Sequence, residues 1–355
     1  MLTVYTPEIE KVGMVENYSS LQWVRRYQTY GVVELHTAPD PLLEIGNLLY
    51  KDGDAAIIES VVYDLDDKGR ETVVVSGSFV AKYLARRIIY GTAIFNQLQV
   101  EAAMRQIVTN YAISPTPADW AVPNLILGDY RGYAPVTTHQ TSYAALTDAL
   151  TDMAAATGLG YRVWLDTQSL KLVFDVYEGR NLTGQTAAGH TVFAPEFENV
   201  TRQSYEENER DYYNIAVVAG QGEGADRRVI VTGDTAAAGL AARVVYVDAR
   251  DIGKDDQGQP LPEPEQDALL VTRGLEKLAK QQLIACFECE INPDGNLKYK
   301  EDYDLGDIVT CRSKRWGKRV DARIMEINEI YEVSGSRLTV TFGEPAPTVL
   351  DKLRG

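Results

Sequence analysis

Histidine, the residue most often used for acid–base catalysis near neutral pH, occurs only three times in this chain of 355 residues. His36, His139 and His190 each stand alone in a polar or turn-rich stretch. The chain has no His-Glu-x-x-His zinc motif and no Gly-x-Ser-x-Gly nucleophile elbow, and the nearest approach to the elbow, Ser76-Gly77-Ser78, lacks the required spacing. The sequence therefore gives no support for a zinc-dependent or serine hydrolase.

The three cysteines are a second place where chemistry could lie. Cys286 and Cys289 have the spacing of redox or zinc-knuckle pairs, and Cys311 could be a third ligand. The pair falls in a strand-like run, however, where residues three apart point to opposite faces, and a second close pair is missing. Three cysteines cannot all pair with one another, so we expect reduced core thiols rather than a metal site or a disulfide framework.

Two carboxylate-rich stretches could in principle form metal or catalytic sites. Asp64 to Gly69 is similar to a calcium loop, but Lys68 stands where an oxygen ligand is needed and Val75 occupies the position of the bidentate Glu. We expect a hairpin turn there. A glycosidase could use the acidic cluster in residues 203–211, although such a run usually marks a solvated face. Its members are Glu206, Glu207, Glu209 and Asp211.

A glycine-rich stretch begins like a dinucleotide fingerprint. It reads Gly220-Gln221-Gly222-Glu223-Gly224, carries the acidic Glu223 and Asp226, and precedes a strand-like run instead of a helix. We expect a hairpin loop. Together these patterns predict no catalytic, cofactor-binding or metal-binding residue, and no enzymatic activity.

Length and composition are those of a folded chain with more than one domain. The 355 residues exceed what one hydrophobic core usually serves, and 45% hydrophobic residues exclude a disordered chain. No apolar run approaches the roughly 20 residues of a membrane helix, and no basic-then-apolar leader opens the chain. We therefore expect no membrane anchor, and synthesis in a cytoplasm.

The chain is acidic, with a net charge of −16 from 35 Lys and Arg against 51 Asp and Glu. This balance argues against general nucleic-acid binding, because no surplus of cations exists to release counterions. Two interpretations stay open. The charge could serve solubility alone, or it could line a DNA conduit to which the duplex does not adhere, within a screening length of about 8–10 Å.

The first 82 residues have the pattern of strands and turns. Residues 56–63 and 71–76 flank Asp66-Asp67-Lys68-Gly69, a composition typical of a hairpin turn. Residues 32–37 alternate in either of two phases before prolines at 39 and 41 end the run. We expect a small antiparallel barrel or sandwich.

Residues 83–180 mix helix and strand. A first helix has helically spaced apolar residues and should end before Ser114; they are Val100, Met104, Ile107, Val108 and Tyr111. A second helix should begin at Thr141 or Ser142 and end at Gly158 or Gly160, with an apolar face of Tyr143, Leu146, Leu150 and Met153. A hairpin follows, whose alternating face is Leu170, Leu172, Phe174 and Val176. We expect an α/β insertion packed beside a barrel.

Residues 181–345 return to strands, with one helix. Residues 181–189 and 255–265 have the composition of exposed loops or linkers. The third helix should bury one stripe, namely Ala268, Val271, Leu275 and Leu278. Gly274 weakens this helix by about 1 kcal/mol relative to Ala, so packing must hold it.

The strands near the C-terminus have the clearest alternation. A polar turn at Asp304, Gly306 and Asp307 starts an apolar strand. In the last strand Leu338, Val340 and Phe342 take one face, while Arg337, Thr339 and Thr341 take the other. This is the pattern of a half-buried antiparallel sheet.

These C-terminal residues resemble a known family. Residues 303–310, YDLGDIVT, and residues 322–343, ARIMEINEIYEVSGSRLTVTFG, followed by the proline-bearing EPAPTVL, look like the C-terminal signature of the siphophage tail hub proteins, also called tail-associated or baseplate hub proteins. Residues 1–39 resemble the opening of the same family, which is related in fold to the trimeric hub that carries the central spike of contractile phage tails. The resemblance covers essentially the whole chain and is strongest at residues 1–40 and 296–343.

The resemblance implies a mainly β fold with an α+β insertion. Its domains would be two antiparallel tube-type β-barrels at 1–82 and 181–345, an α/β domain at 83–180 and a tail at 346–355. It implies a homotrimeric baseplate hub in the virion tail that adapts sixfold to threefold symmetry, lets DNA pass through its lumen and anchors the tail tip. The implied partners are the distal tail or tail-tube protein, the tape measure protein, and the tip, spike and other baseplate proteins. No catalytic residue is carried over, and Asp304, Gly306 and Asp307 would only shape a turn.

Two other functions stay open. Trp120, Tyr130 and Tyr133 lie in a loop-rich stretch and could stack on sugars, as in a carbohydrate-binding adhesin of the tail tip, although such aromatics serve protein partners equally well. A cell-wall hydrolase is the other, because some relatives of the hub family continue into a peptidase or glycosidase. The chain ends at Gly355, soon after the last expected strand, so we expect no such domain.

Overall fold

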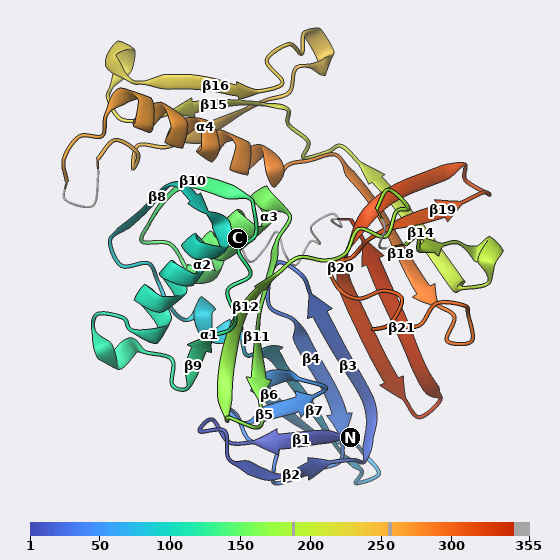
Figure 1. Ribbon diagram of the computed structural model, residues 1–355. Helices are drawn as coiled ribbons and strands as arrows, with labels where there is room; N and C mark the ends of the chain where they lie inside the picture. The colour runs from blue at the N-terminus through green and yellow to red at the C-terminus, as the bar shows by residue number, and fades with distance from the viewer. Residues whose placement is uncertain (187–188, 255–257, 344–355) are drawn as a thin grey trace.

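The computed structural model describes residues 1–186, 189–254 and 258–343 (Figure 1). The predicted tail at 346–355 and the EPAPTVL motif lie outside the described residues, as do parts of the predicted loops at 181–189 and 255–265.

Most strands join one large sheet, ordered β14-β18-β21-β20-β3-β4-β7-β6-β5-β1-β2. The N-terminal strands are β1 (Leu2–Tyr5), β2 (Lys11–Val15), β3 (Tyr18–Arg26), β4 (Val32–Thr37), β5 (Leu48–Lys51), β6 (Asp54–Leu65) and β7 (Glu71–Phe79). The C-terminal strands are β14 (Val200–Asn208), β18 (Ile284–Ile291), β20 (Lys318–Glu332) and β21 (Gly335–Phe342). Off this path, β19 (Ile308–Ser313) pairs with the first part of β20, and β13 (Val192–Phe193) pairs in parallel with β19. The predicted mainly β class is confirmed.

The N-terminal and C-terminal strands are joined in this sheet and do not form two separate barrels. β3 pairs antiparallel with β20, Arg26 opposite Glu326 and Ser20 opposite Glu332. We call this pairing the seam; in Figure 1 it brings blue and red strands side by side. Within the described ranges β2 and β14 each have one neighbour, so no barrel closes. The expectation of closed barrels was wrong because β3 and β20 satisfy each other's free backbone groups across the seam.

The hydrophobic cores of the N-terminal and C-terminal strands lie on one face of the sheet, on both sides of the seam. On the opposite face Ala55 and Ile57 of β6 join the core of the insertion. Strand alternation turns Leu21 and Trp23 of β3 to the same face as Ile327 of β20 and Val340 of β21. In β4 the residues that face this core are Val33 and Leu35, which settles the phase that the sequence left open. The opposite face is left to mostly polar side chains.

The α/β insertion has its own apolar core. Its elements are α1 (Lys82–Ala85), β8 (Thr92–Gln99), α2 (Val100–Val108), β9 (Leu125–Leu127), β10 (Val136–Ser142), α3 (Leu146–Thr157), β11 (Gly160–Asp166) and β12 (Lys171–Tyr177). A π-helical turn, Thr109–Ile113, extends α2 as far as the predicted stop before Ser114. Helix α3 ends as predicted at Gly158, in the left-handed conformation with φ of 73°.

Two details of this insertion differ from expectation. Tyr143 is exposed and lies outside α3, and the residue that precedes the helix is Ala145, because β10 continues through Ser142, which pairs with Thr92. Leu170 is exposed in the turn before β12, with φ of 54°.

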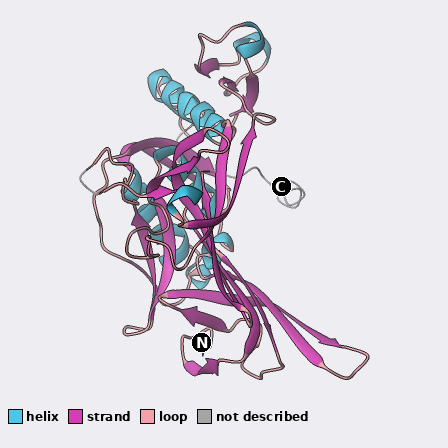
Figure 2. Ribbon diagram, turned by 90° about the vertical axis from the view of Figure 1, so that its right-hand side faces the viewer, coloured by secondary structure: helices cyan, strands magenta, loops and turns pink. Residues whose placement is uncertain are grey.

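A third unit consists of β15 (Ile215–Ala219), β16 (Val229–Gly233), β17 (Val244–Asp248) and α4 (Glu263–Ala279), and we call it the α4 unit. The helix covers one face of the three strands around a separate core, and Figures 1 and 2 show this unit standing away from the large sheet. The sequence pattern predicts the α4 unit as part of the second barrel. Short 3₁₀ turns lie at Ala118–Trp120, Pro195–Phe197, Gly224–Asp226 and Gly239–Ala241.

Of the predicted buried stripe of α4, only Leu278 is buried. Leu269, Leu270, Gly274 and Leu278 face the strands, while Leu275 is exposed. A Cβ at Gly274 would lie 2.4 Å from the Thr232 methyl carbon, so the glycine lets the helix approach the sheet. The apolar spacing could not reveal a stripe that includes a glycine.

The first residues of the predicted loop at 181–189 are attached to the C-terminal core. Leu182 is buried in the C-terminal core, and its backbone N–H donates to the Ile308 carbonyl oxygen at 2.7 Å. No helix in the described residues combines the length and the apolarity that crossing a membrane would need.

Candidate functional site

The face of the large sheet opposite these two cores carries mostly polar side chains. They come from eight neighbouring strands, β14-β18-β21-β20-β3-β4-β7-β6, and we call this surface the polar face. Its polar residues include Arg202, Ser204, Glu206, Glu288, Glu290, Arg337, Thr339, Thr341, Glu326, Asn328, Arg26, Gln22, Glu34, Ser76, Ser78 and Ser60. The apolar Val24, Val32, Val74 and Ile330 lie among them.

Strand register aligns these residues in rows across the seam. Gln22 of β3 lies opposite Ile330 of β20 on one side and opposite Glu34 of β4 on the other, and Glu34 in turn lies opposite Ser76. Because side chains alternate between the two faces of a sheet, the register of each strand pair determines which of its side chains share the polar face. The polar face therefore extends across the seam from the C-terminal to the N-terminal half.

Carboxylates predominate at the β14 and β18 end of the polar face. Among the described residues no ion pair involves Glu206, Glu288 or Glu290, whereas Glu326 binds Arg26 across the seam at 2.8 Å. Cys286 lies in the same row as Glu206. Burial, together with the charges of Glu206, Glu288 and Glu326, raises the pKa of its thiol to about 12. This end of the face would repel anions.

The polar face is hollowed on the N-terminal side of the seam. A cavity of about 680 Å³ lies over β3, β4 and β7. Its walls include Gln22, Arg26, Glu34, Ser76 and Lys82. The surface is thus concave here, and the residues that line the cavity form no catalytic grouping.

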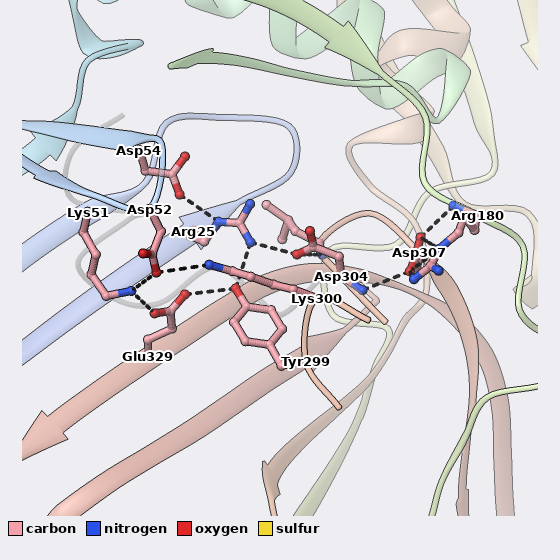
Figure 3. A network of polar contacts seen from close by, with 11 residues as sticks. Arg25, Lys51, Asp52, Asp54, Arg180, Tyr299, Lys300, Asp304, Asp307 and Glu329 are labelled. Atoms are coloured by element: carbon pink, nitrogen blue, oxygen red, sulfur yellow. Dashed lines mark hydrogen bonds and ion pairs between the residues drawn. The ribbon is translucent and has the colours of Figure 1, made fainter. Parts of the chain in front are cut away.

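Behind the polar face, a network of charged and phenolic groups joins the two halves of the chain (Figure 3). The guanidinium of Arg25 donates to Asp54 at 2.9 Å, to Asp304 at 2.8 Å and to the Tyr299 hydroxyl at 2.8 Å. Burial alone would lower the pKa of Arg25, but Tyr299, Asp54 and Asp304 outweigh it and raise that pKa. Arg25 therefore stays charged at the centre of the network.

A second ion pair lies beside it on β5 and β20. The Lys51 ammonium lies 2.5 Å from Glu329, which also accepts hydrogen bonds from the hydroxyls of Tyr299 at 3.0 Å and Tyr331 at 2.8 Å. Burial would raise the pKa of Glu329, but the hydrogen bond from Lys51, its charge and the Tyr331 hydroxyl lower it. Burial and the charge of Glu329 raise the pKa of Tyr331 to about 12.

The predicted turn at Asp304, Gly306 and Asp307 is confirmed and extends the network. Asp307 accepts from the Asp304 backbone N–H at 2.9 Å and from the Arg180 guanidinium at 2.7 Å. Gly306 has φ of 93°, and a Cβ there would overlap the ring of Tyr27 at 2.3 Å. The turn fastens the end of the insertion to the C-terminal strands.

The cysteines and histidines do not form a metal or catalytic site. Cys286 faces the polar side of β18 and Cys289 the core side, as expected for residues three apart in a strand. His36 binds Glu34 of the same strand, and His139 binds Glu276, which lies 137 positions away in the chain. In the part of the chain that the structure describes, no three His, Cys, Asp or Glu side chains are close enough to hold a metal ion.

The acidic and glycine-rich stretches have structural roles. Glu207 binds Lys318 at 2.5 Å and Glu209 binds Arg243 at 2.7 Å, so two of the four carboxylates are held in separate ion pairs. Residues 220–224 lie in the connection between β15 and β16, as predicted. Asp66 accepts the backbone N–H groups of Lys68 and Arg70, which closes the β6–β7 hairpin in place of a calcium loop.

The aromatic cluster differs in membership from the predicted one. Trp120 packs edge to face on Tyr90, which also contacts Tyr143, and all three are exposed. Tyr130 instead binds Gln99. Sequence proximity pointed to the wrong tyrosines because Tyr90 and Tyr143 come from segments on either side of the β8–β10 ribbon.

Three solved structures share this fold over nearly the whole chain. A tail protein from Neisseria meningitidis MC58 has 16% identity and a TM-score of 0.57, covering 97% of this chain and 96% of its own. The 43 kDa tail protein of prophage MuSo2 from Shewanella oneidensis has 12% identity, a TM-score of 0.57 and coverages of 96% and 97%. Prophage tail protein gp18 from Listeria monocytogenes EGD-e has 11% identity, a TM-score of 0.55 and coverages of 99% and 97%.

Comparison with the curated proteins gives no match. Among protein families, the Siphovirus ReqiPepy6 Gp37-like proteins match residues 1–344. The resemblance to a siphophage family that the terminal motifs suggested is thereby confirmed. The chain belongs to the family of Siphovirus ReqiPepy6 Gp37-like proteins.

Proposed function

We propose that this protein is the structural hub of a phage tail, in which three copies form a ring that continues the tail tube. The observation that carries the proposal is the polar face, which extends across the seam and has hydrophobic cores behind it. The three solved structures with this fold are tail proteins from bacteria or their prophages. This likeness supports a structural and non-enzymatic role.

The edges of the polar face suggest how copies would join. β14 pairs only with β18, and beyond Ile58 the outer half of β6 pairs only with β7 among the described strands. That half of β6 exposes Val62, Tyr63 and Leu65. Exposed apolar edge strands are templates for pairing with another chain. In the proposed ring β14 of one copy lies beside β6 of the next, and rotational symmetry closes the circle.

The size of such a ring suits a DNA passage. Eight strands from each of three copies, spaced about 4.8 Å apart, give a circumference of about 115 Å and a diameter of about 37 Å, and strand tilt would widen it. Side chains of about 5 Å on each wall leave a lumen of about 27 Å. Glu206, Glu288 and Glu290 would face the passing duplex and repel it, so DNA would be in transit only.

In this proposal the polar face adapts the sixfold tube to a threefold tip, because each copy presents four strands on either side of the seam. The tail-tube or distal tail protein and the tape measure protein would meet one rim, and the tip, spike and other baseplate proteins the other. The chain would act in the virion tail after synthesis in the bacterial host.

The mass of the purified protein tests the ring. Light scattering should give three times 39.4 kDa, and negative-stain images should show a central hole. Replacing Tyr63 and Leu65 by Lys should give monomers, whereas Ile126→Lys, at an exposed apolar position on β9 outside the proposed contact, should leave the ring intact. A wild-type chain that stays monomeric even with tail-tube and baseplate proteins present would refute the proposal.

The lumen is tested separately by charge reversal. Glu288→Lys should make the ring retain duplex DNA at low salt and release it as salt rises. Glu263→Lys, on the exposed start of α4, is the matched control and should not retain DNA. Equal retention by both variants would mean that the polar face is not the DNA-facing surface.

A carbohydrate-binding adhesin is the second candidate, favoured by the exposed aromatic trio of Tyr90, Trp120 and Tyr143. Such rings can stack on sugars. If this function holds, the protein binds host glycans on an array and Trp120→Ala abolishes binding, while Trp316→Ala, an exposed tryptophan outside the trio, does not.

A further inference from the structure

The α4 unit meets the α/β insertion through polar groups rather than through an apolar core. Strand β10 has five consecutive polar residues, Thr137 to Thr141, and all five are buried. Helix α4 packs against this strand, although the α4 unit keeps its own separate hydrophobic core. A buried surface of this composition must satisfy its hydrogen-bonding groups locally.

A cleft of about 520 Å³ opens at this junction. Its walls come from β10, α3, the loop after β17 and α4. The residues that concern its chemistry are His139, Gln140, Asp148, Asp152, Asp251, Arg273, Glu276 and Lys280. We call it the acceptor cleft.

Two buried side chains of the acceptor cleft have an atom without a hydrogen-bond partner among the described residues. These atoms are Nε2 of His139 and Oε1 of Gln140, and both residues are only 3% exposed. Their other polar atoms are engaged: His139 Nδ1 lies 2.5 Å from the Glu276 carboxylate, and Gln140 Nε2 donates to the Asp251 carbonyl oxygen at 2.8 Å.

The engagement of Gln140 fixes the character of its unpartnered atom. A carbonyl only accepts, so the amide nitrogen of Gln140 faces Asp251 and its oxygen is free to accept. Oε1 of Gln140 thus calls for a donor.

The charges of the cleft point to the same kind of ligand. Four carboxylates line it, from Asp148, Asp152, Asp251 and Glu276, against two cations. Those cations are already engaged, Lys280 with Asp152 at 2.5 Å and Arg273 with Asp251 at 2.9 Å. An additional cation with N–H donors would balance the remaining negative charge and donate to Gln140 Oε1.

We propose that the acceptor cleft binds a primary alkylammonium group. The group donates to Gln140 Oε1, while Asp148 and Asp251 at the exposed mouth supply the attraction. An ammonium suits the cleft because it has three donors and no acceptor on a narrow alkyl stem. Its source is either a free polyamine or a lysine side chain of a neighbouring tail protein. Because the cleft joins three segments, an occupied cleft also fixes the α4 unit to the insertion.

Calorimetric titration at low salt tests the proposal with two probes. They are 1,4-diaminobutane and lysine blocked at its α-amino and carboxyl groups. Both should bind saturably, while blocked lysine acetylated at Nζ and sodium chloride of equal ionic strength should not. Tighter binding of diaminobutane would assign the site to polyamines, and tighter binding of blocked lysine to a protein side chain.

Variants decide whether the binding occurs in the cleft. Gln140→Leu removes an acceptor and should weaken binding at least tenfold. Asp148→Asn, at the exposed mouth where folding is not at risk, should weaken it severalfold. Glu263→Gln, on the same helix but outside the cleft, should bind as the wild type does. Absence of saturable binding, or binding unchanged in both Gln140→Leu and Asp148→Asn, would overturn the proposal and leave a solvent-filled cleft. Neither result depends on whether the ring forms.

Discussion

Arg25 donates a hydrogen bond to Asp304 at 2.8 Å although the two residues lie 279 positions apart in the chain. The contact lies on the core side of the sheet, beside the pairing of β3 with β20. Because Arg25 also binds Asp54 of β6, one guanidinium holds both halves of the sheet. The continuity of the polar face therefore rests on a network that is hidden behind it.

Removing this guanidinium should be costly. Arg25→Met leaves Asp54 buried without its cation, and breaking a buried pair in this way typically costs about 3–5 kcal/mol in the free energy of unfolding. Urea denaturation measures the loss. Arg26→Met is the matched control, because the neighbouring Arg26 forms a partly exposed pair with Glu326 that should contribute only about 0–1 kcal/mol. Equal losses in the two variants would mean that the Arg25 network does not hold the seam.

The free energy of unfolding should depend on pH through the ionisation of Glu329. Its pKa is lowered in the folded protein, so the unfolded chain binds more protons in the acid range. The stabilisation is complete above the unfolded pKa, about 4.3, and is lost as pH falls through the folded pKa. The destabilisation of Glu329→Gln relative to wild type should therefore be largest near pH 7 and shrink below about pH 4.3.

Asp54 provides a control of opposite sign. Burial raises its folded pKa despite the nearby Arg25. The protonated form is thus favoured by folding, and the contribution of Asp54 is greatest below its unfolded pKa and declines as pH rises through the folded value. Relative to Asp54→Asn, the wild type should gain stability on acidification. Parallel pH profiles for the two variants would contradict both assignments.

The glycine in the buried stripe of α4 should resist substitution. Gly274→Ala would raise the intrinsic helix propensity by about 1 kcal/mol, but the added Cβ would overlap Thr232 and Val218. We expect a net loss of about 1–3 kcal/mol through overpacking. Hydrogen exchange of the α4 and β15 amides would report it, with Thr272→Ala on the exposed side of the helix as the control. A more protected Gly274→Ala variant would show that the helix does not approach the strands as closely as described.

The cysteines should be unreactive until the protein unfolds. Burial raises the pKa of Cys289 to about 12, raises that of Cys286 to a similar value, and raises that of Cys311 well above its usual range. At pH 8 almost no thiolate forms, so an aromatic disulfide reagent should modify no cysteine in the folded protein and all three in guanidinium. Rapid labelling of the folded protein would contradict the described placement of β18.

The sequence was most informative where one face of an element is buried. The alternation of Leu338, Val340 and Phe342 and the Gly158 end of α3 were found correctly, because period and capping are local properties. The stripe of α4 was misplaced because Gly274 has no apolar side chain to count. The predicted closed barrels were wrong because the partner of β3 lies some 300 residues away, and strand pairing at that distance leaves no mark in local pattern. The acceptor cleft was missed for the same reason, since His139 and Glu276 are 137 positions apart.

The seam also bears on how the chain is made. β3 leaves the ribosome early, but β20 is synthesised some 300 residues later, so one edge of the N-terminal strands stays open through most of translation. Contacts of such long sequence separation form slowly, and open edges invite wrong pairing in the meantime. A chain interrupted before β20 could not complete the polar face or lock Arg25. Incomplete products would thereby be barred from assembly, which makes the last strands a checkpoint for the integrity of every copy.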